Sequence, residues 1–373
     1  MKKVIILGAG FIGSTVADEL SNDYTVTIAD VDTNRLKNLS NKKINKVTSN
    51  LSSEENLNKI ISDSNLVIGA LPGFMGFKAL KSVISAGKNI VDVSFFPEDP
   101  FLLDELAKEK NVTAIVDCGV SPGLNNIILG YHNRMMTVNN YRCIVGGLPY
   151  KREWPFQYKA FFSPIDVIEE YIRPARIVVN GKIIEKPALS DPENINYKNI
   201  GDLEAFNTDG LRSLLKTMNI PNMVEKTLRY PGHIDLMKIL REVGFFSEKE
   251  IEVKGKSVKP IDLTAKLLFP FWSPDKDEED YTILDILIEG KDEKISHRYF
   301  VFDKYDKVTG ISSMARTTGY SCSSAARLFL EGKFERKGIC PPEFLGEDEG
   351  CFNFVISYLN KKGISIHHSE KLS

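Results

Sequence analysis

The stretch "VIILGAGFIG", residues 4–13, decides the fold of the first part of this chain. An apolar run of strand length passes into glycines spaced Gly8-x-Gly10-x-x-Gly13 and then into a helical pattern. Gly8 permits a tight turn, Gly10 lets the backbone approach a pyrophosphate, and Gly13 lets the helix pack on the strand. The unpaired N–H groups at the helix N-terminus add a partial positive charge, so the stretch predicts a loop that binds the phosphates of a dinucleotide. The residues expected to contact it are Gly8, Gly10, Phe11, Ile12 and Gly13.

An acidic residue ends the second predicted strand. The run "YTVTIA" begins at Tyr24 and is followed by Asp30, 22 residues after Gly8, which completes the dinucleotide-binding fingerprint. A carboxylate there can accept hydrogen bonds from the adenosine ribose hydroxyls and would repel a 2′-phosphate, so we expect NAD rather than NADP. Arg35 keeps NADP open as the alternative, and Asp32 is expected to cap the following helix.

Short runs rich in Val, Ile and Leu alternate with helical patterns through the first 120 or so residues. Further strands are expected at "LVIGA" from Leu66, "NIVDV" from Asn89 and "VTAIVD" from Val112, and Ser52 with Glu55 has the pattern of a capping box. Nearly continuous apolar strands are typical of a parallel sheet that helices cover on both faces. We therefore predict an α/β fold whose N-terminal domain, residues 1–122, is a Rossmann doubly wound parallel sheet.

In such a sheet, ligands bind beyond the carboxyl ends of the strands. The segments that follow the later strands are residues 70–76, 92–96 and 117–126. The first of them is expected to pass close to the cofactor, although a plain strand-to-helix turn explains it equally well. Ser121-Pro122 predicts a helix N-cap followed by proline at the first helical position. The expected cofactor contacts in the first segment are Ala70, Leu71 and Pro72.

After about residue 130 the pattern changes to strands, hairpins and a few helices. "RIVVNGKIIEK" at residues 176–186 predicts a β-hairpin around Asn180-Gly181, and "SPIDVIEEYI" from Ser163 predicts a capped helix. Further strands are expected around "EKTLRY", "EIEVKG", "YTILDILIEG" and "HRYFVF". We predict a second α+β domain of mixed or antiparallel sheet at residues 123–310 that binds substrate and forms a homodimer. Residues 311–373 are predicted to be a helical C-terminal segment.

The composition excludes several classes of function. The chain has 373 residues, a formal net charge of −2 and a pI near 6.3, so nothing indicates a nucleic-acid partner. No apolar run reaches the roughly 18–20 residues that span a bilayer, and no signal-like segment precedes the first strand, so we expect no membrane association and a cytoplasmic protein. The five cysteines form no Cys-x-x-Cys pair and the five histidines show no ligand spacing, so we expect no metal.

Six blocks in order resemble the saccharopine dehydrogenase-related family. They are "CGVSPGLNN", "VGGLP", "FFSPIDVIEEYIRPARIVVNGK", "EAFNTDGL", "KTLRYPGH" and "GKFERKGICPPE". Within that family they are most similar to the lysine 6-dehydrogenases. The resemblance implies NAD-dependent oxidation of the ε-carbon of L-lysine to an imine, which water converts to allysine and ammonia, with cyclisation to piperideine-6-carboxylate. It also implies that the C-terminal segment returns to the nucleotide domain.

Departures from the glutamate-forming saccharopine branch carry the choice of substrate. The residues of this chain at three positions of that branch are Ser121 for an aspartate, Phe162 for a tryptophan and Thr208 for the arginine that pairs with the glutamyl carboxylate. Losing a bidentate partner would leave a buried anion unpaired, so a substrate with a single carboxylate fits better. Saccharopine dehydrogenase, carboxypolyamine dehydrogenase and a non-catalytic NAD-binding protein remain the alternatives.

Hydride leaves the ε-carbon only from a free amine, so the site needs a base for the ammonium proton. The candidates in the resemblance blocks or at a strand end are Asp92, Glu204, Asp209 and His233. Each has a structural alternative, such as a cap, a solvated loop or the start of a helix. The α-carboxylate is expected to bind Arg229, with Arg173 and Arg212 behind it, although a structural ion pair is nearly as plausible for Arg229. The other expected substrate contacts are Ser121, Phe162 and Thr208.

Overall fold

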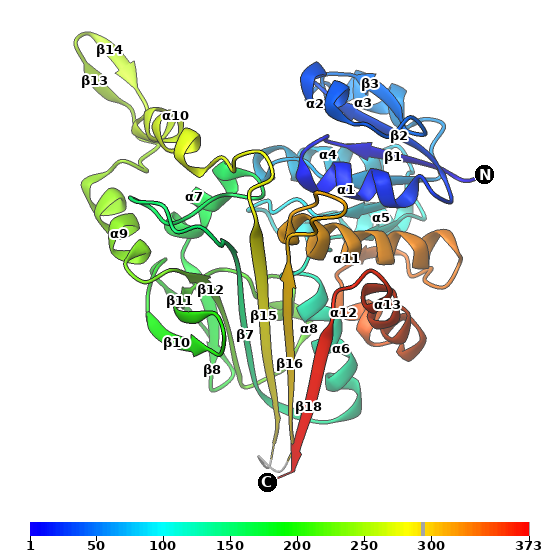
Figure 1. Cartoon of the computed structure of the whole chain (residues 1–373). Helices are drawn as coiled ribbons and strands as arrows, with labels where there is room; N and C mark the ends of the chain where they lie inside the picture. The colour runs from blue at the N-terminus through cyan, green and yellow to red at the C-terminus, as the bar shows by residue number, and fades with distance from the viewer. Residues whose placement is uncertain (292–294, 373) are drawn as a thin grey trace. The chain divides into compact units, whose positions relative to one another are not determined.

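The structure, a computed structural model, describes residues 1–291 and 295–372 (Figure 1). The chain divides into two compact units. The first joins Met1–Met136 to Ala315–Ile366, and the second joins Thr137–Met314 to the segment from His367 onward. The roles given to the predicted domains, substrate binding and dimerisation, stay predictions.

The first unit contains a seven-stranded parallel sheet in the order β17-β6-β5-β4-β1-β2-β3. This order confirms the predicted Rossmann sheet. Successive strands are added in one direction from β1 to β3 and in the other from β4 onward, and in such folds a dinucleotide binds at this switch point between β1 and β4. Its strands are β1 (Lys3–Leu7), β2 (Thr25–Asp30), β3 (Asn45–Thr48), β4 (Leu66–Gly69), β5 (Ile90–Asp92), β6 (Thr113–Ile115) and β17 (Gly338–Cys340).

The first unit also contains helices, which alternate with the strands through its N-terminal part as the pattern predicts. They are α1 (Phe11–Leu20), α2 (Thr33–Asn38), α3 (Glu54–Ile61), α4 (Gly73–Ser85), η1 (Pro100–Leu103), α5 (Asp104–Glu109), α6 (Leu124–Met135), α11 (Ser313–Leu330), α12 (Glu343–Gly346) and α13 (Glu349–Lys361). The core between them is aliphatic, with Ile5, Leu7 and Val67 among its buried residues.

Local chemistry sets the helix starts, and two predicted starts are wrong. Asp32 caps α2 as predicted, because its side chain accepts the N–H groups of the first turn. The cap of α3 is Ser53 rather than Ser52, since the Ser53 hydroxyl accepts the N–H of Asn56. Ser121-Pro122 does not start a helix: α6 begins two residues later, after Gly123 at φ 140°, a conformation that favours glycine.

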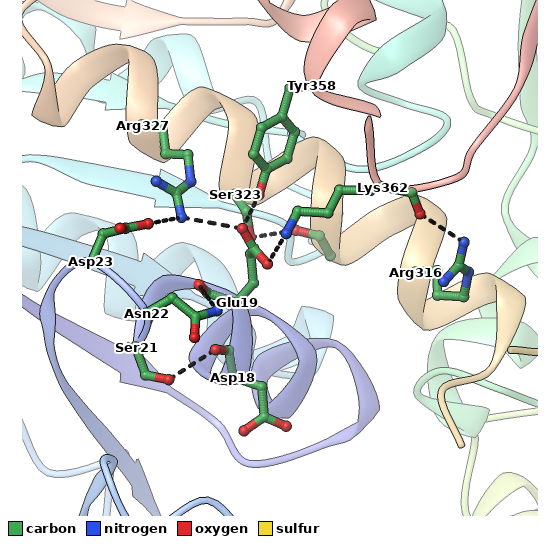
Figure 2. Close-up of polar contacts among 11 residues, drawn as sticks. Asp18, Glu19, Ser21, Asn22, Asp23, Arg316, Ser323, Arg327, Tyr358 and Lys362 are labelled. Atoms are coloured by element: carbon green, nitrogen blue, oxygen red, sulfur yellow. Dashed lines mark hydrogen bonds and ion pairs between the residues drawn. The ribbon is translucent and has the colours of Figure 1, made fainter. Parts of the chain in front are cut away.

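Segments from the end of the chain complete the first unit. Strand β17 pairs with β6, and α11 and α13 contact α1 through Glu19. Figure 2 shows Arg327, Tyr358 and Lys362 converging on the Glu19 carboxylate. The C-terminal segment is therefore not purely helical, because it contains β17 and also β18 (Ile366–Leu372), which joins the sheet of the second unit.

The second unit contains a nine-stranded mixed sheet, as predicted. Its path is β10-β11-β12-β7-β15-β16-β18, with β8 and β9 attached to β12. Strands β12 and β7 run parallel, while β11, β15 and β16 pair antiparallel with their neighbours. The strands are β7 (Val138–Pro149), β8 (Ala175–Val179), β9 (Lys182–Lys186), β10 (Glu193–Tyr197), β11 (Gly201–Asn207), β12 (Asn222–Arg229), β15 (Asp280–Gly290) and β16 (Ile295–Lys304).

The predicted hairpin and helix of this unit are both present. Asn180 and Gly181 join β8 to β9 with φ values of 50° and 75°, the left-handed pair that a two-residue hairpin turn requires. Helix α7 (Pro164–Ile172) begins at the predicted Ser163-Pro164 pair. The remaining elements are α8 (Leu214–Thr217), α9 (His233–Val243), α10 (Pro260–Trp272) and a separate hairpin of β13 (Ile251–Val253) and β14 (Lys256–Val258).

Aromatic side chains fill the core of the second unit. Tyr171, Phe206, Trp272 and Tyr281 are all less than 2% exposed. None of the helices in the described ranges is long and apolar enough to cross a membrane.

Candidate functional site

The glycine loop has the geometry that phosphate binding requires. A Cβ on Gly8 would lie 2.4 Å from the carbonyl oxygen of Ala70, and one on Gly13 would lie 2.0 Å from that of Gly8, so the packing of the loop requires both glycines. A Cβ on Gly10 would meet no atom within 4 Å, and no side chain of the described residues caps the α1 N-terminus there. The space above Gly10 and the N–H groups of α1 thus suit an anion, and phosphate binding stays a prediction.

Asp30 is held in place by backbone groups. Its side chain is 7% exposed, Oδ2 accepts the N–H of Ala9 at 2.6 Å, and Oδ1 accepts the N–H of Asp32 at 2.8 Å. Each carboxylate oxygen has a second lone pair, so both can still accept a ribose hydroxyl. The guanidinium of Arg35 lies 3.7 Å from the Asp32 carboxylate and is therefore directed to a carboxylate of its own helix.

The residues expected beside the cofactor after β4 form a tight turn into α4. The N–H of Ala70 donates to the carbonyl of Leu7, the N–H of Leu71 donates to the Ser94 hydroxyl at 3.3 Å, and Pro72 is the N-cap of α4. In the first turn of α1, Phe11 is half exposed and Ile12 is partly buried. The plain turn is thus present, and contact with the cofactor is compatible with it but stays a prediction.

Asp92 ends β5 and is 1% exposed. Its Oδ1 accepts the N–H of Ser94 at 2.6 Å, and only a glycine fits at position 69, where a Cβ would lie 1.9 Å from Oδ2. Burial raises the pKa of Asp92 from 3.8 to about 7; hydrogen bonds from Ser94 oppose the rise and nearby Asp117 adds to it. A carboxyl group that exchanges its proton near neutral pH is suited to acid–base chemistry.

Arg229 lies at the end of β12 in the second unit and is 2% exposed. Its Nη2 donates to Glu170 at 2.5 Å and its Nε donates to the Tyr171 hydroxyl at 3.0 Å. The guanidinium carbon lies 4.3 Å from the centre of the Tyr158 ring, a cation–π distance. Arg229 therefore forms a structural ion pair with Glu170, the alternative considered above. A substrate carboxylate would be an additional partner of its guanidinium.

His233 is buried and neutral. Its Nδ1 lies 2.9 Å from the carbonyl oxygen of Phe156, which can only accept, so Nδ1 carries the proton and Nε2 accepts from the Tyr171 hydroxyl at 2.9 Å. Burial, with the neighbouring charge of Arg229, lowers the pKa of His233 to about 3. Arg229, Tyr171 and His233 thus form one directed chain of hydrogen bonds, and His233 is too weak a base to deprotonate an ammonium in this arrangement.

Glu204 on β11 faces Arg229 across the strand pair. Antiparallel partners project to the same side of a sheet. Its Oε2 is buried and has no hydrogen-bond partner among residues 1–291 and 295–372, and burial raises its pKa against an opposing N–H from Gly232. Of the three candidate bases in the second unit, Glu204 therefore has a carboxylate oxygen available for a proton.

Asp209 and Thr208 have partners within the protein. Arg176 donates two hydrogen bonds of 2.8 Å to Asp209, from Nε to Oδ1 and from Nη2 to Oδ2. The Thr208 hydroxyl donates to Glu225 at 2.5 Å and lies 2.8 Å from that of Thr227. Thr208 and Asp209 are both less than 7% exposed, so their contacts stabilise the surrounding protein.

The remaining candidates lie apart from this cluster. Phe162 packs against the core of the second unit, and Ser121 lies in the first unit before α6. Arg173 pairs with Glu169 on its own helix at 3.3 Å, and Arg212 is buried. Asp92 and Ser121 belong to one unit and the other catalytic and substrate candidates to the other.

Sequence reasoning missed Glu225, Glu170 and Tyr171. Burial raises the pKa of Glu225 to about 8, so this carboxyl keeps its proton near neutral pH. A signal for it exists, because Glu225, Thr227 and Arg229 alternate along one strand and so share one face, here a buried one. Glu170 and Tyr171 follow Val167 by three and four residues, which places them on its buried helical stripe.

Two family profiles together match almost the whole chain. The profile of the saccharopine dehydrogenase NADP binding domain matches residues 4–115, and that of the saccharopine dehydrogenase C-terminal domain matches residues 119–364. The mitochondrial alpha-aminoadipic semialdehyde synthase of Mus musculus is 23% identical over 423 residues, which cover 91% of this chain and 45% of that protein. This chain therefore spans less than half the length of that relative.

Two further proteins match along nearly all of their length. Carboxyaminopropylagmatine dehydrogenase of Synechocystis sp. is 22% identical over 387 residues, covering 93% of this chain and 94% of that protein. The solved structure of apo saccharopine dehydrogenase (L-Glu forming) from Saccharomyces cerevisiae aligns with a TM-score of 0.78 and 19% identity over 99% of this chain and 100% of that one. At this identity, the likeness shows a shared fold.

Proposed function

Since the chain belongs to the saccharopine dehydrogenase family, we propose that it is an NAD-dependent dehydrogenase of L-lysine that acts at the ε-carbon. The hydride would pass from this carbon to the nicotinamide of NAD while the nitrogen lone pair forms the C=N bond. Water would then add to the iminium and release ammonia, leaving allysine, which cyclises to piperideine-6-carboxylate. NAD is reduced to NADH, and one C–H bond of lysine is oxidised.

The surroundings of Thr208 carry the choice of substrate. The resemblance places there the arginine that binds the glutamyl carboxylate in the saccharopine branch, whereas here the Thr208 hydroxyl bonds to Glu225, which keeps its proton near neutral pH. The neighbouring guanidinium of Arg176 is already bound at both ends of the Asp209 carboxylate. A second substrate carboxylate would face a neutral carboxyl group and a guanidinium that already binds Asp209, so it would lack the charged partner that a buried carboxylate needs, and a substrate with one carboxylate is favoured.

Glu204 is the proposed base for the ammonium proton. Lysine arrives protonated, and its amine can release a hydride only after that proton is removed. The Oε2 of Glu204 is buried and has no hydrogen-bond partner within the described part of the chain, and burial raises the pKa of this group. Both properties suit a group that takes a proton and then stabilises an iminium. Asp92, with a pKa of about 7, is the corresponding candidate of the nucleotide-binding unit.

Asp30 supports NAD as the cofactor. Its carboxylate is fixed between the N–H groups of Ala9 and Asp32, and its remaining lone pairs would accept ribose hydroxyls. A 2′-phosphate would meet this negative charge. The profile that matches this unit is named for NADP binding. Our proposal therefore departs from that name in the cofactor, because it assigns NAD to this chain.

A carboxylated polyamine is the second candidate substrate. The Synechocystis carboxyaminopropylagmatine dehydrogenase matches over 93% of this chain and 94% of its own length, and its name implies an amine substrate with one carboxyl group. Such a compound would satisfy the same argument from Thr208, whereas saccharopine would not.

A substrate panel tests the proposal. L-lysine, saccharopine and a carboxylated polyamine are each supplied with NAD and with NADP, and the reduced nicotinamide is followed by its absorbance. The proposal predicts the highest kcat/KM for L-lysine with NAD. Fast turnover of saccharopine without turnover of lysine would refute the substrate assignment, and binding of NAD without turnover of any of the three would favour a non-catalytic NAD-binding protein.

A further inference from the structure

Two histidines from distant parts of the sequence meet on the sheet of the second unit. His297 lies on β16 and His368 lies on β18, and these strands are neighbours in the sheet (Figure 1). Nδ1 of His297 is 3.1 Å from Nε2 of His368. The two residues are 71 positions apart, so the spacing of the histidines in the sequence gives no sign of this pair.

Packing orients the ring of His368. The ring stacks on that of Tyr299, with 4.3 Å between the ring centres and 13° between the planes, and Tyr299 is 5% exposed. Tyr299 and His297 are two residues apart on β16, so their side chains lie on the same face of the sheet. The imidazole of His368 is therefore held beside His297 by a buried aromatic ring as well as by the contact between the two nitrogens.

A carboxylate lies beside the two imidazoles. Glu370 follows His368 by two residues on β18, and its Oε2 is 3.9 Å from Nδ1 of His297. Alternation along a strand places His368 and Glu370 on one face of β18 and His367 on the other. The side chain of His297 is 12% exposed and that of Glu370 is 49% exposed. The three groups are thus partly shielded from water, and the carboxylate has room to move toward the nitrogens.

We propose that His297, His368 and Glu370 bind a divalent transition-metal ion such as Zn²⁺. Imidazole nitrogen and carboxylate oxygen are both ligands of Zn²⁺, whereas Ca²⁺ and Mg²⁺ prefer sites made of oxygen alone. Two nitrogens bound to Zn²⁺ at about 2.05 Å in tetrahedral geometry are about 3.3 Å apart, close to the 3.1 Å between these two nitrogens. Three ligands from the protein leave one tetrahedral position for a further ligand.

The ion takes the place of a proton. In the absence of metal, one of the two facing nitrogens must carry a hydrogen in order to donate it to the other. A metal ion accepts the lone pairs of both nitrogens at once, and the charge of Glu370 offsets part of the charge of the ion.

The ion would hold β18 in the sheet. β18 is the last strand in the path of the nine-stranded sheet, and six of its seven residues are exposed. Strands with few buried side chains open more readily than the core of a domain. Ligands on both β16 and β18 would oppose this opening, and this role does not depend on the reaction that the protein catalyses.

Titration calorimetry with ZnCl₂ at pH 7.5 tests the site in the full chain, purified without a histidine tag and freed of metal by a chelator. One Zn²⁺ per chain is expected. His297→Ala and His368→Ala should each weaken binding by about 10-fold or more, since loss of even an outer partner of a metal ligand costs about 10–100-fold. His367→Ala is the matched control, because this exposed histidine neighbours His368 on the opposite face of β18 and should leave binding unchanged.

Hydrogen exchange with and without Zn²⁺ tests the effect on β18, and circular dichroism verifies that each variant is folded. Zn²⁺ should slow exchange in β18 of the unmodified protein and of His367→Ala but not of His368→Ala. Absence of Zn²⁺ binding, or equal binding by His368→Ala and the unmodified protein, would overturn the proposal and leave the contact as a hydrogen bond between two imidazoles. Binding without slower exchange in β18 would overturn the role of the ion in holding this strand.

Discussion

Glu19→Gln is expected to destabilise the first unit by removing the charge at the centre of its C-terminal anchor. Glu19 is 8% exposed; its Oε1 accepts from Arg327 at 3.1 Å and from the Tyr358 hydroxyl at 2.7 Å, and its Oε2 pairs with Lys362 (Figure 2). Glutamine keeps the shape and one acceptor but turns an amide N–H₂ or a neutral oxygen toward the ammonium of Lys362.

The loss of stability depends on the partners that Arg327 and Lys362 retain in the Glu19→Gln variant. Breaking a buried ion pair by removing one partner costs about 3–5 kcal/mol. Arg327 retains Asp23 at 2.7 Å, and the Lys362 side chain is 29% exposed and can be hydrated. We therefore expect a loss of about 2–3 kcal/mol, which lowers Tm by roughly 5–10 °C for a domain of this size.

Thermal and urea unfolding followed by circular dichroism measure this loss. Glu331→Gln is the matched control, because Glu331 pairs with Lys333 at a more exposed site just beyond the end of α11, the helix that carries Arg327, and such pairs contribute below about 1 kcal/mol. Adding Lys362→Met to Glu19→Gln should restore part of the stability. A loss for Glu19→Gln no larger than that of the control would refute the view that this network anchors the C-terminal segment.

Three further changes test the candidate site. Asp30→Ala should weaken NAD binding by roughly 10–100-fold and NADP binding far less, measured by titration of nucleotide fluorescence, and equal losses would remove the ribose role. Burial raises the pKa of Asp92 to about 7, so the folded chain keeps a proton that the unfolded chain releases and stability falls as the pH rises from about 4 to about 7. Asp92→Asn should abolish that decline in urea unfolding at a series of pH values, and an unaltered pH profile would contradict the assignment. Arg229→Met should cost about 3–5 kcal/mol by leaving Glu170 unpaired and should raise KM for the amino acid; Glu170→Gln added to it should restore stability but not KM, and a normal KM would exclude Arg229 from substrate binding.

The sequence alone predicts those parts of the fold that neighbouring residues determine. The glycine spacing, the apolar strands and the acid that ends β2 predict the Rossmann sheet, because turn geometry and two-sided burial leave a direct pattern in the residues. Asn180-Gly181 gives the hairpin for the same reason, since few residue pairs adopt two left-handed conformations in succession.

Features set by distant contacts were missed. Strand β17 is three residues long and exists by pairing with β6, more than 200 residues earlier, so its own sequence reads as a turn. Glu170 and Arg229 are 59 residues apart, and Tyr171 and His233 are 62 apart. Only the packing of α7 against the sheet brings them together, which is why Arg229 was identified but its partners were not.

Lysine with deuterium at the ε-carbon provides the most direct test of the central claim. The purified protein is incubated with this substrate and NAD, and the NADH formed is analysed by mass spectrometry. The account predicts NADH carrying one deuterium, together with allysine or its cyclic imine. Absence of deuterated NADH, while saccharopine reduces NADP under the same conditions, would contradict it.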